Sequence, residues 1–407
     1  MSDILKILVC PANEGGCSFY RAINPYMKLS ELFPHKVQIR FDKNPLGIED
    51  EVGKNQGQWK PDWDFESMRW ADIVMTQNIS NFGGQYTARI VGKAHEFGKF
   101  VHYDTDDLLT NLYEGHRLED VYKNKGLSDI TKFIYNNSNL VTVTQNKFAE
   151  RIKPYLGNCK ALAVIKNAID YNLPSWNHDK QPPPHQRVCR FGWAGGIHHE
   201  EDVKEFAGVP HRVNQKVGRE NIVWHFFGKP PDTGEDNDRW QQDVWTNYEK
   251  TMMRGDKGTK NHFVHHALPP DNYGGIFTMF DVALAPLQMN EFNDSKSEIK
   301  VAECGRYNIP LIASDVGCYS ETIVNGETGY LIDPDAPKSE WVRILTKVAK
   351  NRKLRERMGQ NLHELTEEYF DLNKVVKHRL DLYEECFQEM NFSLESIRNF
   401  KEDKKSD

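Results

Sequence analysis

Short apolar runs alternate with helical patterns along most of this chain of 407 residues. In the first part of the chain the apolar runs cover residues 4–10, 72–77, 100–103, 140–143 and 163–165. They show little alternation of polar and apolar positions, which is typical of parallel strands buried on both faces. Helical patterns over residues 86–97 and 127–135 separate them. This order predicts a doubly wound α/β domain.

A second β–α series follows a polar, proline-rich stretch at residues 172–187. Its apolar runs begin at Arg190 and continue at 222–227, 263–266, 281–285 and 309–313. Each series opens with a strand, a glycine loop and a helix, near Gly15 in the first and near Gly195 in the second. The expected fold class is therefore α/β, with two Rossmann-like doubly wound domains facing a cleft. We place the domains at residues 1–175 and 188–370, followed by a C-terminal helical segment at 371–407.

The most informative segment runs from residue 293 to residue 331. Ser295 and Glu298 have the S-x-x-E spacing of a capping box, which predicts a helix whose first residue is Lys296. Asn308 suits the left-handed turn that ends a helix, and Pro310 prevents its continuation. A short buried strand is expected directly afterwards.

Three charged residues of this predicted helix share one face. Lys296, Lys300 and Glu303 stand at positions i, i+4 and i+7. Two lysines at a helix start suit a phosphate, and a carboxylate about 10 Å further along could accept hydrogen bonds from ribose hydroxyls. The alternative is an ordinary solvated Lys/Glu face.

The same segment resembles the C-terminal signature of the GT-B glycosyltransferases, specifically the retaining family 4. The features that carry the resemblance are Glu303, the strand that follows Asn308, and the loop from Gly326 to Gly329. In that family the glutamate binds the donor ribose, and a second glutamate eight positions earlier contacts the sugar. This chain has Ser295 at the second position, which implies that Asn293 or Asp294 contacts the sugar instead.

The resemblance implies a GT-B fold with an N-terminal acceptor domain, a C-terminal nucleotide-sugar domain and a last helix that returns to the N-terminal domain. It implies retaining transfer of a hexosyl or pentosyl group from a nucleotide-diphosphate sugar, with a UDP-sugar as the expected donor. It implies no tightly bound cofactor, and a divalent cation is compatible but not required. Relatives carry an Arg/Lys pair after the first C-domain strand, whereas here His198, Lys296 and Lys300 are expected to supply the charge. The donor-binding candidates are Gly15, Gly16, Gly195, Gly196, His198, Asn293, Ser295, Ser297 and Glu303.

Three carboxylates, Asp104, Asp106 and Asp107, follow a buried strand in the sequence YDTDDLL. Carboxylates at such a position are costly unless they are paired or used. They could ligate a metal, cap a following helix, or face the transferred sugar or the acceptor hydroxyl. We take Asp104 and Asp106, together with Lys296 and Lys300, as the catalytic candidates, and we assign no residue as a metal ligand.

Composition bounds the class of protein. Hydrophobic residues make up 39% and aromatic residues 11%, which is enough for packed cores. No apolar run approaches the roughly 18 residues of a membrane span. The N-terminus lacks the pattern of a signal peptide, and the seven scattered cysteines suit a reducing cytoplasm. The net charge is −7, but residues 1–187 hold 23 Lys and Arg against 22 Asp and Glu, so the first half does not repel a polyanion.

The expected acceptor follows from a further resemblance, because the segments EGGCSFYRAINP and NDSKSEIK look like bacteriophage glycosyltransferases. Several of these modify hydroxymethylated DNA bases, so we expect duplex DNA with bases such as 5-hydroxymethylcytosine, in the host cytoplasm. Aromatic and basic residues that could serve a flipped base and phosphates are Trp59, Trp63, Phe65, Trp70, Arg117, Lys123 and Lys125. The alternatives are a cell-surface polysaccharide or lipid-linked sugar as acceptor, and an inactive GT-B-shaped binding protein.

Overall fold

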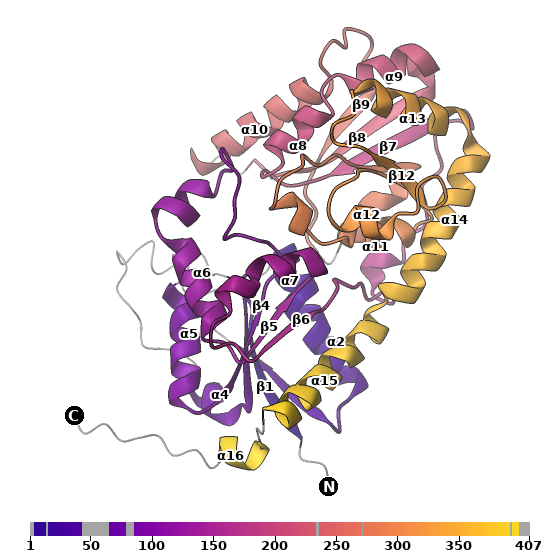
Figure 1. Ribbon diagram of the computed structural model, residues 1–407. Helices are drawn as coiled ribbons and strands as arrows, with labels where there is room; N and C mark the ends of the chain where they lie inside the picture. Colours follow the sequence, from indigo (N-terminus) through magenta and orange to yellow (C-terminus); the bar gives the residue numbers. More distant parts are fainter. Residues whose placement is uncertain are drawn as a thin grey trace. The chain divides into compact units, whose positions relative to one another are not determined.

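The structure is a computed structural model and describes residues 4–13, 15–42, 65–78, 85–232, 236–270, 272–390 and 393–398. The chain forms two compact units (Figure 1). Unit 1 comprises residues 1–168, 295–297 and 372–407, and unit 2 comprises residues 169–294 and 298–371. The short segment 295–297 therefore clusters with unit 1, although it lies between two stretches of unit 2.

Unit 1 is built on a parallel sheet of six strands in the order β2-β1-β3-β4-β5-β6. The strands are β1 Leu5–Cys10, β2 Val37–Phe41, β3 Ile73–Gln77, β4 Phe100–Asp104, β5 Leu140–Val143 and β6 Ala161–Val164. Because successive side chains of a strand point to opposite faces, Ile7 and Val9 enter one core cluster while Leu8 and Cys10 enter another. The continuous apolar runs of the sequence are explained by this double burial.

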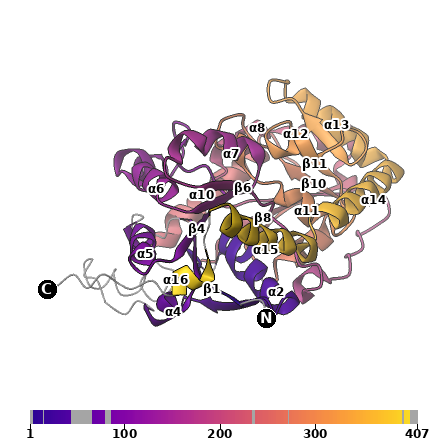
Figure 2. The ribbon, with the colours of Figure 1, turned by 60° about the horizontal axis from the view of Figure 1, so that its bottom comes forward.

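Helices cover both faces of this sheet. They are α1 Gly16–Ser18, η1 Phe19–Ile23 (π-helical), α2 Asn24–Leu32, α4 Phe65–Trp70, α5 Gln85–Glu96, η2 Asp120–Asn124 (π-helical), α6 Leu127–Asn136, α7 Asn146–Ile152, η3 Lys153–Tyr155, α15 Leu372–Glu389 and α16 Leu394–Arg398. Both ribbon views show α15 beside α2, and the two helices contact each other (Figures 1 and 2). The C-terminal helix therefore completes the core of unit 1, with Leu380 and Tyr383 almost fully buried.

Unit 2 contains a second parallel sheet of six strands, in the order β12-β11-β10-β7-β8-β9. The strands are β7 Cys189–Ala194, β8 Ile222–Lys229, β9 His262–His266, β10 Val282–Ala285, β11 Leu311–Ser314 and β12 Gly329–Ile332. Counted within the unit, this is the 3-2-1-4-5-6 order of a Rossmann fold. The chain order therefore reverses between the neighbouring strands β7 and β10.

The helices of unit 2 are η4 Pro174–Trp176, α8 Glu200–Glu205, α9 Val209–Val217, η5 Arg219–Asn221, α10 Asp236–Met252, η6 Tyr273–Met279, α11 Ile299–Gly305, α12 Cys318–Thr322, α13 Ser339–Lys350 and α14 Arg352–Tyr369. A further short 3₁₀ turn, η7, spans Asn293–Ser295. Helices α9 and α13 lie side by side in Figure 1, and so do α11 and α14. The core beneath α9 and α13 is rich in aromatic side chains, among them Phe191 stacked on Trp224.

The predicted fold class is confirmed, and the strands predicted from apolar runs are all present with small shifts at their ends. Strands β2 and β12 and helices α9 and α10 were not predicted. The capping-box prediction is wrong: helix α11 begins at Ile299, its N-cap is Glu298, and no side chain caps it. The predicted helix end is confirmed, because Asn308 has a positive φ of 53° and β11 follows Pro310.

Candidate functional site

Each sheet has one position where the strand order reverses: from one of two neighbouring strands the chain continues toward one edge of the sheet, and from the other strand it continues toward the opposite edge. Ligands of open α/β sheets bind outside the carboxyl ends of the strands at such a position. In unit 2 the position lies between β7 and β10, and in unit 1 it lies between β1 and β3. The predicted glycine loops follow β7 and β1, so both occupy the expected edge of their own sheet.

In unit 2 a buried carboxylate joins the loops that follow β7 and β10. Asp202, with an exposed fraction of 1%, accepts hydrogen bonds at Oδ1 from Asn293 Nδ2 and Gln288 N, at 2.8 and 2.9 Å. Its Oδ2 lies 2.7 Å from Nδ1 of His199. Asn293 also donates to the Gln288 carbonyl at 2.9 Å. Asp202 therefore fixes the path of both loops.

The glycine loop after β7 packs closely against β8. Gly195 N donates to the Phe227 carbonyl at 3.0 Å, and Gly228 has a φ of 125° where the register of β8 shifts. A Cβ on Gly228 would lie 2.0 Å from the Gly195 carbonyl oxygen, so only glycine fits there. Gly196 and His198 are exposed, and the position of a Cβ on Gly196 is open. The backbone at Gly196 is therefore accessible to a ligand.

Two residues of helix α11, Lys300 and Glu303, form a polar cluster with Tyr273 of η6. Lys300 Nζ donates to Glu303 Oε2 and to the Tyr273 hydroxyl, both at 2.8 Å. The Glu303 side chain has an exposed fraction of 2%, whereas that of Lys300 is 22%. Burial alone would lower the pKa of Lys300, but the charges and hydrogen bonds of Glu303 and Tyr273 together outweigh burial and raise the pKa. Lys300 is therefore a permanent cation with part of its surface accessible.

Lys296 and its neighbours do not share this helix face, because segment 295–297 precedes α11 and clusters with unit 1. Within unit 1, Arg151 Nη1 donates to Ser295 Oγ and Asn167 Nδ2 donates to Ser297 Oγ, each at 2.8 Å. The prediction of one shared face for Lys296, Lys300 and Glu303 is wrong for Lys296. Asp294 belongs to unit 2, where its Oδ1 accepts a hydrogen bond from Gly317 N at 2.9 Å.

In unit 1 the glycine turn after β1 is tied to the end of β3. Ser18 Oγ donates to Gln77 Oε1 at 2.7 Å, and Gly15 N donates to Asn13 Oδ1 at 2.8 Å. Gly15 and Gly16 are exposed, and a Cβ on Gly16 would meet no atom within 4 Å. The backbone of Gly16 is thus accessible, as expected for a loop that a ligand approaches.

Asp104, the last residue of β4, is fully buried in an ion pair. Arg21 Nε and Nη2 donate to its two oxygens at 2.8 and 2.7 Å, and Thr142 Oγ1 donates to Oδ2 at 2.6 Å. Arg379 Nη1, on α15, lies 3.4 Å from the same oxygen. Burial would raise the pKa of Asp104, but Arg21 and Arg379 together lower it to about 2. This geometry favours a scaffolding role for Asp104.

The hydrogen-bond network continues from Asp104 into the core through Thr142, His102 and Tyr383. The donor and acceptor of each hydrogen bond follow from the number of protons that each side chain carries. The single proton of Thr142 is donated to Asp104, so Thr142 Oγ1 accepts the proton of His102 Nε2, 2.7 Å away. His102 Nδ1 is then the acceptor for the Tyr383 hydroxyl at 2.6 Å, and Tyr383 accepts from Tyr26. Helix α15 is thereby joined to β4 through hydrogen bonds as well as apolar contacts.

His102 makes stability depend on pH. Burial lowers its pKa from 6.5 to about 3, and burial also lowers the pKa of His225 in unit 2 to about 3. Between pH 3 and 6.5 the unfolded chain binds protons that the folded chain does not, so stability falls as the pH decreases. We expect urea denaturation to give a free energy of unfolding about 2 kcal/mol lower per histidine at pH 5 than at pH 7. His102→Gln should show a smaller difference, and equal values for the wild type at the two pH values would contradict this interpretation.

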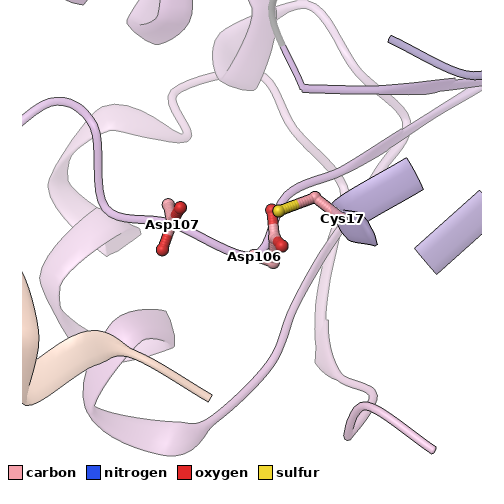
Figure 3. A group of neighbouring side chains, drawn as sticks. All are labelled: Cys17, Asp106 and Asp107. Atoms are coloured by element: carbon pink, nitrogen blue, oxygen red, sulfur yellow. The ribbon is translucent and has the colours of Figure 1, made fainter. Parts of the chain in front are cut away.

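Asp106 and Asp107 form an acidic turn with Cys17, as Figure 3 shows. One ligand atom of each residue lies within 4.8 Å of the others, so the group could hold a divalent cation. Asn78 Nδ2 donates to Asp106 Oδ1 at 2.8 Å. Burial and the Asp106 carboxylate raise the pKa of Asp107 to about 7, while Lys296 opposes this, and the Asp106 charge raises the pKa of the Cys17 thiol. The helix-cap hypothesis is wrong, because no helix follows Asp106 before Asp120.

The residues expected to contact DNA make other contacts where the structure describes them. Arg40 lies over the Trp70 ring at 4.2 Å, and Phe65 packs edge-on against Phe97. Lys123 and Lys125 pair with Glu119 and Asp120 at 3.3 and 3.4 Å. Trp59 and Trp63 lie outside the described residues.

Several residues of these clusters were not singled out from the sequence. Tyr273 approaches Lys300 from 27 positions away, and Arg21 approaches Asp104 from 83 positions away. The only signal for Arg21 was a charged residue inside an otherwise apolar stretch, SFYRAI. Cys17 and Asp202 carried no signal of their own.

The two Rossmann-like units define the GT-B fold, the architecture of one large class of glycosyltransferases. Residues 213–364, which include Lys300 and Glu303, match the family model described as glycosyl transferases group 1. Sequence comparison with curated proteins gives no match.

Solved structures with the same fold include sucrose-phosphate synthase from Thermosynechococcus elongatus, with 12% identity, coverage of 95% of this chain and 100% of that one, and a TM-score of 0.67. HepE (Alr3699) from Anabaena, in complex with UDP and glucose, has 11% identity, coverage of 94% and 100%, and a TM-score of 0.59. TarM from S. aureus, in complex with Fondaparinux, alpha-GlcNAc-glycerol and UDP, has 13% identity, coverage of 76% and 55%, and a TM-score of 0.54. At these identities the likeness concerns the fold. None of the described helices is long and apolar enough to span a membrane.

Proposed function

We propose that the protein is a glycosyltransferase that moves a hexosyl or pentosyl group from a UDP-sugar to an acceptor hydroxyl. The observation that carries the proposal is the cluster of Lys300, Glu303 and Tyr273. It lies after β10, at the edge of the sheet where open α/β folds bind ligands, and within the segment that matches the glycosyl transferases group 1. HepE, with the same fold, was solved with UDP.

In this proposal unit 2 binds the donor. Glu303 accepts hydrogen bonds from the ribose hydroxyls, and the permanent ammonium of Lys300 faces the diphosphate. The loop at Gly195 and Gly196 lets the backbone approach the donor, with His198 beside it. Asp202 holds the loops in place, so little reorganisation is needed when charge develops on the leaving diphosphate.

Unit 1 supplies the acceptor side in the same proposal. Asp106 and Asp107 are the carboxylates available to orient the acceptor hydroxyl, next to the accessible backbone of Gly16. Lys296 lies close enough to lower the pKa of Asp107. In the transfer the bond from the anomeric carbon to the diphosphate oxygen breaks, the acceptor oxygen bonds to that carbon, and the proton of the acceptor hydroxyl passes to the departing diphosphate. Retention of configuration is the finer part of the proposal and rests on the resemblance of segment 293–331.

The test is donor binding and turnover by the full-length protein. We expect calorimetry to show binding of UDP at least about tenfold tighter than of ADP or GDP, and slow hydrolysis of one UDP-sugar without acceptor. NMR of the transferred sugar should show the anomeric configuration of the donor. If no nucleotide binds and no nucleotide sugar is hydrolysed or transferred, the protein is not this enzyme. That result would favour the alternative of a GT-B-shaped binding protein.

The acceptor is tested separately with the same donor. The pairing of Lys123 and Lys125 with acidic neighbours removes part of the support for a DNA acceptor. We therefore assay a labelled donor with hydroxymethylated duplex DNA and, in parallel, with oligosaccharides and lipid-linked sugars. Label in DNA that decreases with added salt would support the DNA acceptor. Label only in a saccharide would assign the acceptor to that class.

A further inference from the structure

Unit 2 contains a cavity of about 470 Å³ that is separate from the cluster at Lys300. Its walls come from the segment before β7, from Asp281 before β10, from Asn308 before β11, and from the first turns of α14. This volume suits a small molecule. The cavity therefore opens at the edge of the sheet where these strands begin.

The loops proposed to bind the donor do not line this cavity. Those loops follow Ala194 and Ala285, the last residues of β7 and β10, whereas the cavity is lined by Val188, Arg190 and Asp281 at the beginnings of these strands. A strand of six residues such as β7 is about 20 Å long. A ligand of the cavity is thus separated from the proposed donor site by the length of the sheet.

The cavity lining carries an excess of positive charge. Four cationic side chains, Lys180, Arg190, Arg352 and Arg355, face two carboxylates. The carboxylates are neutralised by two of the arginines, because Arg190 Nη2 lies 2.9 Å from Asp281 Oδ1 and Arg352 Nε lies 2.7 Å from Glu356 Oε1. Lys180 and Arg355 are left in excess.

Arg355 is the more deeply buried of these two excess cations, with an exposed fraction of 7%. Its Nη1 donates to the carbonyls of Val348 and Ala349 at the end of α13, at 2.7 and 2.8 Å, which fixes the direction of the guanidinium. Among the described residues, no acceptor is found for its Nε and Nη2. A buried guanidinium with donors left over is a ready partner for an anion.

The lowered pKa of Lys180 indicates the same positive potential. Its Nζ lies 3.9 Å from Asp281 Oδ1, yet its pKa is lowered, first by burial and then by the charges of Arg190 and Arg355. The first turn of the 18-residue helix α14 adds the positive end of a helix dipole to the same wall. Pro182 and Pro183 complete the lining with an apolar surface.

We propose that this cavity is a second binding site, for a small phosphorylated molecule whose phosphate lies between Lys180 and Arg355 and whose apolar part lies against Pro182 and Pro183. The site is independent of the proposed transferase activity. The phosphate supplies acceptors for the donors of Arg355, and its charge offsets the excess cations.

The test is calorimetric titration of the full-length protein with inorganic phosphate and with phenyl phosphate. We expect one saturable site for each, tighter for phenyl phosphate because of the prolines, and unchanged by saturating UDP. Lys180→Met, at a side chain that is 39% exposed, should weaken binding by about tenfold, and Arg355→Met by at least as much. Arg357→Met is the matched control, because Arg357 lies exposed on the same helix outside the cavity.

Circular dichroism and thermal melting show whether each variant is folded. The proposal is overturned by the absence of saturable binding up to about 50 mM phosphate, by equal affinity of Lys180→Met and the wild type, or by competition with UDP. Because UDP binding is measured separately, failure of this site and failure of the transferase proposal are distinguishable.

Discussion

Replacing Glu303 by glutamine is expected to lower kcat/KM for the UDP-sugar by about 100-fold. The substitution keeps the size of the side chain but removes the negative charge, which pairs with Lys300 and would strengthen the hydrogen bonds donated by the ribose hydroxyls. A 100-fold decrease corresponds to about 2.7 kcal/mol, and one hydrogen bond to a charged group contributes about 1.5–3 kcal/mol, so the loss of one such bond accounts for the expected factor. The measurement is donor turnover at saturating acceptor, or donor hydrolysis where no acceptor is known.

A second readout connects the effect to the ribose. Wild-type protein should bind 2′-deoxy-UDP about tenfold more weakly than UDP, and this difference should largely disappear in Glu303→Gln. Glu364→Gln, an exposed change on α14, serves as the control and should behave like the wild type. An unchanged preference for UDP over 2′-deoxy-UDP in Glu303→Gln would place the ribose elsewhere.

Lys300 gives a related but separable expectation. Lys300→Met removes the cation from the diphosphate and breaks the ion pair between Lys300 and Glu303. Affinity for UDP should therefore fall more than affinity for uridine, which has no phosphate. Equal losses for both ligands would mean that Lys300 acts through the position of Glu303.

The strands could be predicted from the sequence because parallel strands are buried on both faces. A run such as LVTV at β5 contains no charged residue and only one polar residue, Thr142, and the structure buries all four residues. Strand β2 was missed because it alternates polar with apolar residues and, among the described residues, pairs with β1 alone at the edge of its sheet. Strand β12, at the edge of the other sheet, was missed for a different reason, because its first residue, Gly329, also ends the glycine loop predicted at residues 326–329.

The start of α11 could not be predicted, because local pattern and tertiary contact compete there. Ser295 and Glu298 have the spacing of a capping box, yet Ser295 accepts a hydrogen bond from Arg151, a residue 144 positions away. A capping interaction contributes about 1 kcal/mol, and a hydrogen bond from a charged guanidinium contributes as much or more. The spacing of Ser295 and Glu298 is visible in the sequence, whereas the contact of Ser295 with Arg151 cannot be predicted from it.

The same reasoning applies to Asp104, for which the sequence left three roles open. Its ion pair with Arg21 unites β4 with the π-helical segment η1, and its contact with Arg379 adds the C-terminal helix α15. No local pattern reports contacts between residues so distant in the chain. What the sequence does show is the cost of a carboxylate after a buried strand, and the structure supplies its partners.

Asp104→Asn is expected to be the most destabilising of the substitutions considered. It leaves Arg21 and Arg379 buried without a counter-charge, and breaking such a pair costs about 3–5 kcal/mol. Because the pKa of Asp104 is lowered to about 2, the stabilisation is present above the ordinary value of 3.8 and is lost as the pH falls through 2. Urea denaturation at pH 7 measures the loss.

A double-mutant cycle separates the ion pair from the general cost of changing the core. Arg21→Met alone should also destabilise, but the double variant Arg21→Met/Asp104→Asn should lose less than the sum of the two single variants. Asp129→Asn, at an exposed carboxylate 3.8 Å from Lys132, is the matched control and should change stability little. Strict additivity of the two core substitutions would mean that Arg21 and Asp104 act independently. In that case β4 would be held by its pairing with β3 and β5, the hydrogen bonds of His102 and apolar contacts, and the acidic turn at Asp106 and Asp107 would keep its position without the pair.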